Sequence, residues 1–259
     1  MFVINLDRRK DRLMYMAAQL QNIGLDWERV SAHDMQSVND AFLAGEINMQ
    51  GQIIGMGRGS QCCALTNFDL YRRIVAEDSP AALILQDDVE LSPKIASFMQ
   101  TLDWLPTGID LVQFEKYGRR ASRRLLGPAL GVMPVDGARL HRLFSRTAGA
   151  ACYLITKQGA ARILAEKPLL NMPIDHFLFS PNVSPLFDRL NVAVVSPALA
   201  RQNEDEFGSD LDSERQKRRK GLTARLRRLW REINRIPHQL VAMTKGARWR
   251  DFNYQDRDQ

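Results

Sequence analysis

Two adjacent carboxylates, Asp87 and Asp88, directly follow an apolar run over residues 81–85. Such a run, with turn signals at both ends, predicts a buried strand that ends at the acidic pair. Neighbouring carboxylates repel one another, and a divalent cation such as Mg²⁺ or Mn²⁺ reverses that repulsion because it prefers hard oxygen ligands. The pattern predicts a metal site that holds a diphosphate. The alternative is an Asp-rich turn that caps the next helix.

The sequence around this pair alternates strands and helices in the manner of an α/β protein. Residues 2–6 predict a short strand, apolar residues at helical spacing over 13–23 predict a helix, and a second strand is expected at about 27–31. Open sheets of this class bind ligands beyond the carboxyl ends of their strands. Further strands are expected at 110–114, 151–155 and 192–195, helices at 61–76, 93–102 and 157–167, a short helical segment from 173, and irregular segments at 35–59 and 116–146.

The positive charge of the chain is concentrated at one end. The formal net charge is +6, yet residues 212–259 contain 14 Lys or Arg against 6 Asp or Glu. Residues 1–211 hold the other 22 basic and 24 acidic side chains, a net charge of −2. We therefore expect a main domain over 1–211 and a basic tail over 212–259. A slightly acidic main domain argues against a nucleic-acid-binding core.

The tail has the pattern of a basic amphipathic helix. Residues 215–231 contain nine Lys or Arg and no acid. Such a helix is typical of a segment that lies on an anionic membrane surface. The alternative is a helix that packs its apolar stripe on the main domain. Apolar side chains recur at the spacing of one helix face: Leu222, Leu226, Leu229, Trp230 and Ile233.

The cysteines, the hydropathy and the first residues of the sequence bear on where in the cell the protein is located. The three cysteines include the adjacent pair Cys62 and Cys63, which fits a reducing compartment better than a disulfide framework. No apolar run reaches the roughly 18 residues that a membrane span needs. The first residues place charges after a very short apolar stretch, the reverse of a secretory signal. We therefore expect a cytoplasmic protein.

Four sequence blocks stand in a specific order: 2–12, 63–67 followed by 83–89, 149–160, and 173–175. Together they resemble glycosyltransferase family 25, the lipooligosaccharide galactosyltransferase type of Gram-negative bacteria. The resemblance implies a GT-A-type α/β fold, a Rossmann-like mixed sheet with flanking helices, to which the basic helical tail is added. It also implies a metal-dependent enzyme that moves a sugar, commonly galactose, from a UDP-sugar donor to a lipooligosaccharide, lipopolysaccharide or other glycan acceptor.

The resemblance further implies a cofactor and a location. The family commonly uses Mn²⁺, and Mg²⁺ is the alternative. Acceptors of this kind are anchored in a membrane, so we expect a peripheral protein at the inner face of the bacterial inner membrane, held there by its tail. No nucleic-acid partner is expected.

The predicted metal ligand is Asp88, with Asp87 beside it as a second ligand or on the ribose. Asp175 is the candidate general base, because transfer with inversion needs a carboxylate to accept the proton of the acceptor hydroxyl. Its alternative is a helix-start residue that complements the helix dipole.

The donor nucleotide is assigned to residues that follow the first two strands. Asn5, Arg8 and Arg12 come just after the first strand, where arginines could reach uracil or phosphate. The alternative is a charged, solvated helix start. Asp34 follows the second strand and could hold the ribose or base, or act only as an N-cap.

Two positions depart from the family pattern. Gln86 stands where the family has Glu, and Asn67 where it has His. Gln86, also assigned to the donor site, can hydrogen-bond but brings no charge. The second hypothesis is therefore a catalytically weakened, glycosyltransferase-like binding or scaffold protein.

Overall fold

The computed structural model describes the chain except for residues 51, 53, 119–121, 168–169, 209–221 and 255–259. It begins with the predicted strand–helix–strand unit: β1 (Phe2–Asn5), α1 (Lys10–Ile23) and β2 (Glu28–Ser31). The two strands pair in parallel, and β3 (Ala81–Gln86) pairs in parallel with the other side of β1. Gly24 ends α1 in the left-handed conformation at φ 74°, as expected of a glycine there.

The segment between β2 and β3 contains more helix than the sequence analysis predicts. The long helix α3 (Arg58–Ala76) begins three residues before its predicted start, and α2 (Asp40–Glu46) lies within the segment predicted to be irregular. That prediction was wrong at α2 because Asn39 caps the helix. Its side-chain oxygen accepts from the backbone N–H groups of Ala41 and Phe42, while Leu43 is buried.

Within the described residues, the main sheet has nine strands in the order β11-β6-β7-β9-β5-β8-β3-β1-β2. It is mixed, because β8 is antiparallel to both of its neighbours whereas β1, β2 and β3 run parallel. The strands not yet introduced are β5 (Leu111–Gln113), β6 (Ser122–Leu130), β7 (Arg139–Leu143), β8 (Cys152–Thr156), β9 (Val192–Ser196) and β11 (Arg248–Phe252).

Two parts of this sheet differ from the sequence prediction. The segment 116–146, predicted to be irregular, forms the hairpin of β6 and β7, whose buried leucines include Leu126 and Leu140. The tail over 212–259 supplies the edge strand β11, which pairs with β6 and buries Phe252 completely. The tail is therefore a helix followed by a strand of the main sheet.

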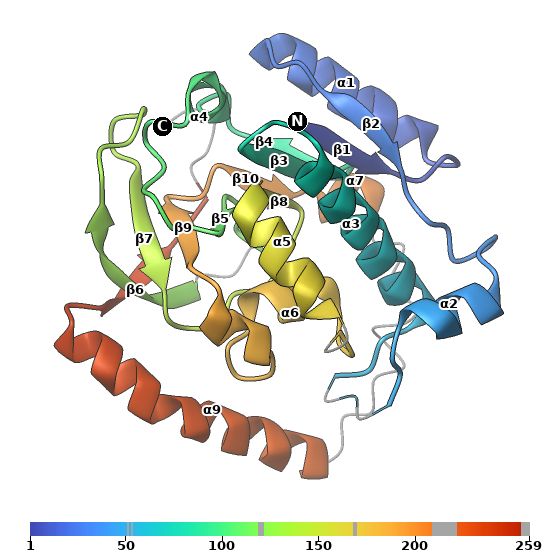
Figure 1. The fold of residues 1–259 in the computed structure, drawn as a ribbon. Helices are drawn as coiled ribbons and strands as arrows, with labels where there is room; N and C mark the ends of the chain where they lie inside the picture. The colour runs from blue at the N-terminus through green and yellow to red at the C-terminus, as the bar shows by residue number, and fades with distance from the viewer. Residues whose placement is uncertain (51, 53, 119–121, 168–169, 209–221, 255–259) are drawn as a thin grey trace.

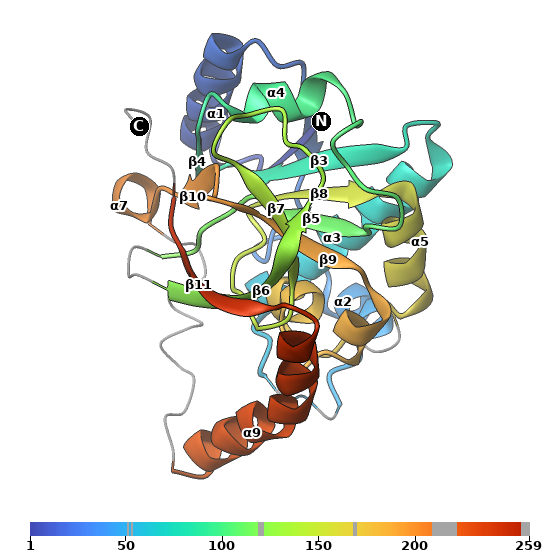
Figure 2. The ribbon, with the colours of Figure 1, turned by 90° about the vertical axis from the view of Figure 1, so that its left-hand side faces the viewer.

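Helices cover both faces of the sheet. α3, α5 (Lys157–Ala165) and α6 (Ile174–Phe179) pack on one face with Ile4 and Ile84. On the other face, α1 and α4 (Ile95–Gln100) pack with Val3 and Leu83. Successive strand residues thus point to opposite layers, as the pleat requires. Figure 1 shows α3 and α5 in front of the sheet, and Figure 2 shows the layers from the side.

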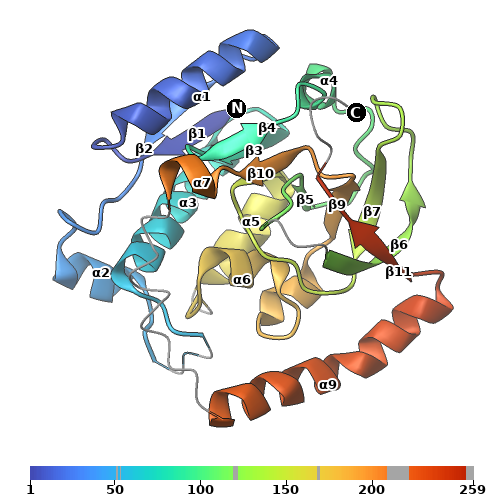
Figure 3. The same ribbon diagram turned by 180° about the vertical axis from the view of Figure 1, so that it is seen from behind.

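The remaining elements lie around this core. A small two-stranded sheet joins β4 (Val89–Leu91) to β10 (Ala200–Gln202). A 3-10 helix (Pro185–Arg189) precedes β9, and the short helix α7 (Glu204–Phe207) follows β10. Helix α9 (Leu222–Thr244) runs along the outside of the molecule beyond α6, as Figures 1 and 3 show. Among the described residues, no helix combines the length and apolar character needed to cross a membrane.

Candidate active site

The carboxyl ends of β1, β2 and β3 meet at one edge of the sheet because the three strands are parallel neighbours. A pocket of about 140 Å³, here called the strand-end pocket, opens at this edge. It brings together six residues that the sequence assigns to the donor and the metal. These residues are Arg8, Arg12, Asp34, Gln86, Asp87 and Asp88.

Arg12 lies inside this site rather than on a solvated helix start. Its Nη1 atom is 3.1 Å from Oδ1 of Asp87 and 3.3 Å from Oδ2 of Asp88. Its Nη2 atom donates to the carbonyl oxygen of Gly208 at 3.0 Å, and the residue is only 5% exposed. The guanidinium therefore neutralises both carboxylates in the fold. In the fold Arg12 holds the acidic pair, and its predicted contact with uracil or phosphate stays a prediction.

Asn5 has a supporting position behind the acidic pair. It is 1% exposed, and its Nδ2 donates to Oδ2 of Asp87 at 2.7 Å and to the carbonyl of Arg9 at 2.9 Å. Its Oδ1 accepts from Nε of Arg29 at 2.9 Å. Because these contacts occupy the amide, Asn5 orients Asp87 in the fold, and its assignment to the donor nucleotide stays a prediction.

Arg8 and Asp34 form an ion pair at the rim of the strand-end pocket. Nε of Arg8 is 2.8 Å from Oδ2 of Asp34, and both side chains are partly exposed. The other oxygen of Asp34 accepts from the backbone N–H of Gln36 at 3.0 Å, so Asp34 also closes a turn. The N-cap role considered for Asp34 is absent, because the next helix, α2, is capped by Asn39, and the predicted contact of Asp34 with the ribose or base stays a prediction.

The donor set of this pocket fits a cation of the magnesium type only at Asp88. Among the described residues, no cluster of three or more His, Cys, Asp or Glu side chains could form a complete metal cage. Both oxygens of Asp87 accept hydrogen bonds, from Asn5 and Arg12. Mg²⁺ is commonly bound by one or two carboxylates together with substrate phosphates, and the 14% exposed side chain of Asp88 suits that arrangement.

A second and larger pocket, of about 760 Å³, adjoins the first. Asp175 lines this large pocket from the first turn of α6, and Gly149 and Tyr117 line other parts of it. Cys63, Gln86 and Gln202 line both pockets. These three shared residues mark the place where the two pockets meet, here called the junction. Asp88 and Asp175, far apart in sequence, thus lie on two sides of the junction.

Glu115, which the sequence analysis did not select, lies beneath this junction. It is fully buried, and its Oε2 accepts from the backbone N–H of Ala151 at 2.6 Å. Burial, with a smaller contribution from the charges of Asp88 and Asp175, raises the pKa of Glu115 to about 8. The available sequence signal was an acid directly after the strand predicted at 110–114, the same pattern that selected Asp87.

The two departures from the family pattern differ in their surroundings. Gln86 faces the junction, with its Nε2 3.9 Å from Sγ of Cys63. Burial raises the pKa of the Cys63 thiol to about 12, and the charges of Asp175 and Asp88 contribute. Cys63 is therefore an uncharged residue in the lining of both pockets. Asn67 is 1% exposed, and its Oδ1 accepts from the hydroxyl of Tyr153 at 2.6 Å. Asn67 therefore belongs to a buried hydrogen-bond network, and only Gln86 bears on the chemistry.

Comparison with known proteins gives a family match and several relatives. The model of glycosyltransferase family 25 (LPS biosynthesis protein) matches residues 1–178, a range that includes every candidate from Asn5 to Asp175. The lipooligosaccharide biosynthesis protein lex-1 of Haemophilus influenzae is 26% identical over 211 residues, which cover 75% of this chain and 67% of that protein.

The matched animal proteins are longer. A glycosyltransferase 25 family member of Drosophila pseudoobscura pseudoobscura is 30% identical over 191 residues, covering 68% of this chain and 29% of that protein. Procollagen galactosyltransferase 2 of Homo sapiens is 25% identical over 191 residues, which also cover 68% of this chain and 29% of that protein. The chain thus spans less than a third of these animal relatives. The family model nevertheless covers more than half of the chain, which confirms the resemblance seen in the four sequence blocks. The protein belongs to glycosyltransferase family 25 and is a glycosyltransferase.

Proposed function

We propose that this glycosyltransferase moves galactose from UDP-galactose to a lipooligosaccharide, lipopolysaccharide or related glycan acceptor, with Mn²⁺ or Mg²⁺ as cofactor and a GT-A-type fold. The observation that carries the proposal is the junction of the two pockets. Asp88 lies on the smaller side and Asp175 on the larger, and Gln86 lies where the pockets meet. The galactose and lipooligosaccharide assignments draw on the names of the relatives.

In this proposal the strand-end pocket receives the nucleotide. Arg8 and Asp34 lie at its rim, where they can hydrogen-bond uracil, ribose or phosphate. Asp88 would hold the cation, and Asn5 and Arg12 keep Asp87 fixed beside it. The bound cation would supply positive charge to the leaving diphosphate.

The large pocket receives the acceptor. Asp175 accepts the proton of the acceptor hydroxyl as that oxygen bonds to the anomeric carbon. The bond between the anomeric carbon and the diphosphate oxygen breaks, and UDP leaves with the electron pair. Gln86 can donate a hydrogen bond to the sugar at the junction but adds no charge to the cation site.

The test is release of UDP from UDP-galactose by the full chain, with water as acceptor, in Mn²⁺ and in excess EDTA. We expect UDP release only with the metal, and slower release from UDP-glucose and UDP-N-acetylglucosamine. Turnover of GDP-sugars or CMP-sugars in place of UDP-sugars would contradict the donor assignment.

One observation favours a second candidate, a glycosyltransferase-like binding protein with weakened catalysis. The residue at the junction is the neutral Gln86 rather than the acid of the family pattern. Tight metal-dependent binding of UDP without release of UDP from any UDP-sugar would support that candidate over the enzyme.

A further inference from the structure

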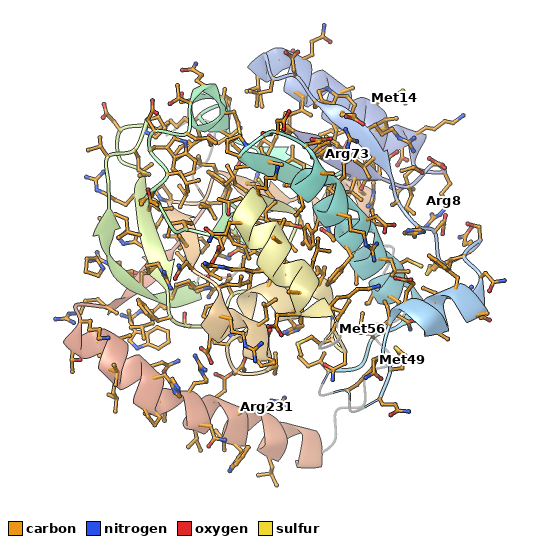
Figure 4. The ribbon with its side chains drawn as sticks, viewed as in Figure 1. Arg8, Met14, Met49, Met56, Arg73 and Arg231 are labelled. Atoms are coloured by element: carbon orange, nitrogen blue, oxygen red, sulfur yellow. The ribbon has the colours of Figure 1, made fainter. Side chains whose placement is uncertain are left out.

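Helix α9 packs against the domain with its charged side. Nδ2 of Asn182 donates to Glu232 at 2.7 Å, and the two Nη atoms of Arg235 each lie 2.8 Å from an oxygen of Asp188. Arg231, labelled in Figure 4, lines the large pocket from the same helix. An amphipathic helix on a domain surface normally turns its apolar stripe inward, and α9 does the opposite.

The apolar stripe of α9 faces outward from Leu226 to Val241. Trp230 is 65% exposed and Leu229 is 57% exposed, whereas the exposed fraction of each core residue of the domain is below a tenth. A continuous apolar surface of this kind marks an interaction site rather than ordinary surface. The exposed members of this outer face are Leu226, Leu229, Trp230, Ile233, Ile236, Leu240 and Val241.

The charge of the sequence around α9 indicates what kind of partner the outer face binds. Residues 215–231, which lead into and include the first part of α9, contain nine Lys or Arg and no acid. A second copy of the chain carries the same basic sequence, and its like charges would oppose docking through the same face. An anionic lipid surface attracts the basic side chains and also accepts the apolar side chains below its headgroups.

We propose that α9 lies flat on the surface of an anionic phospholipid bilayer, with its outer face among the upper acyl chains. Trp230 suits the boundary between headgroups and acyl chains because its ring is apolar and its N–H is polar. The helix lies in the surface and does not cross it, consistent with the hydropathy of the described helices.

This arrangement has a consequence that rests on the proposed function. Since Arg231 of α9 also lines the large pocket, a bound α9 brings that pocket to the bilayer surface. An acceptor anchored in the same bilayer by lipid chains would then reach Asp175 without leaving the membrane. In the cell, the protein would be peripheral, at the inner face of the bacterial inner membrane.

The test is co-sedimentation of the full chain with vesicles of phosphatidylcholine containing 30% phosphatidylglycerol, compared with pure phosphatidylcholine. Deleting 212–259 is unsuitable because the deletion also removes β11 and its buried Phe252. The test variant is the triple change Leu229→Ser, Trp230→Ser and Ile233→Ser. The matched control is Met14→Ser with Val132→Ser, two exposed apolar residues on other elements.

We expect the wild type and the control to bind the anionic vesicles at low salt, with at least tenfold weaker binding to pure phosphatidylcholine and release by 0.5 M salt. The triple variant should lose at least tenfold in binding while its thermal midpoint stays that of the wild type. Equal vesicle binding by the triple variant would overturn the proposal, as would equal binding to both kinds of vesicle.

A second measurement separates the bilayer from a second copy. Sedimentation velocity without vesicles should give a monomer over a wide concentration range. A dimer that the triple variant abolishes would assign the outer face to self-association instead. UDP release in detergent-free solution without vesicles tests the catalytic proposal independently, so failure of either proposal is recognised separately.

Discussion

A Cβ atom placed on Gly149 would lie 2.3 Å from Oε1 of Glu115. Gly149 also has φ of 88°, a conformation that residues with side chains rarely adopt. The loop that carries Gly149 lines the large pocket, so the buried carboxyl of Glu115 forms its support from below. Gln113, two residues earlier on β5, donates to the carbonyls of Ala148 and Gly149 and supports the same loop.

The raised pKa of Glu115 predicts a specific dependence of stability on pH. Its ordinary pKa is 4.5 and its value in the fold is about 8. Between these values the unfolded chain releases the proton while the folded protein keeps it, so stability falls as pH rises through this window, by at most about 1.4 kcal/mol per pH unit. Below the window both states are protonated, and above it both are ionised.

Glu115→Gln should remove this contribution while keeping the shape of the side chain. Urea unfolding of both proteins in EDTA at pH 5.5 and pH 7.5 measures it. We expect the free energy of unfolding of the wild type to fall relative to the variant by up to about 2–3 kcal/mol between the two pH values. Parallel pH dependences of the two proteins would show that Glu115 is ionised throughout.

Asp88→Asn should nearly abolish Mn²⁺-dependent binding of UDP, because the amide brings no negative charge to the cation. Calorimetry with UDP, with and without Mn²⁺, measures this. The fold should survive, since Arg12 keeps Asp87 as a partner. Asp103→Asn, a change at an exposed acid away from the pocket, is the control and should bind UDP like the wild type. Unchanged UDP binding by the Asp88 variant would remove the metal-site assignment.

Gln86→Glu should bind Mn²⁺ and UDP as tightly as the wild type or more tightly, because it adds one negative charge at the junction of the pockets. The same calorimetry measures it. Gln202→Glu adds the same charge to another residue that lines both pockets, and controls for a general electrostatic effect. Weaker binding by the Gln86 variant alone would mean that the glutamine is an adaptation of this protein rather than a partial loss.

Asp175→Asn should keep the donor affinity and lose transfer by roughly 10²-fold or more, the scale of a lost general base. UDP binding by calorimetry and turnover of UDP-galactose separate the two effects. Asp136→Asn, at an exposed loop position, is the matched control. Loss of UDP binding by the Asp175 variant would instead assign Asp175 to the nucleotide.

Features that depend only on neighbouring residues can be predicted from the sequence. The apolar run before Asp87 predicts β3 because burial of a short apolar segment needs no information from elsewhere in the chain. α1 and its end at Gly24 follow from helical spacing and a residue that tolerates positive φ. Asp175 at a helix start follows from the Pro173 that precedes it. Local patterning failed where pairing with a distant strand was decisive, since β6 pairs with β11 and β7 pairs with β9.

Tertiary structure alone decided which side chains face one another. The sequence leaves Arg12 equally suited to solvent or nucleotide, and the packing of α1 against β3 places it between Asp87 and Asp88. The order of strands around β8 put Glu115 beneath Gly149, although 34 positions separate them in the sequence. The sequence also left two orientations open for α9. The spacing of its apolar residues shows that they form a stripe on one side of the helix, but not whether that side faces the domain or points outward. The ion pair of Arg235 with Asp188 and the pairing of β11 with β6 hold that helix with its apolar side outward.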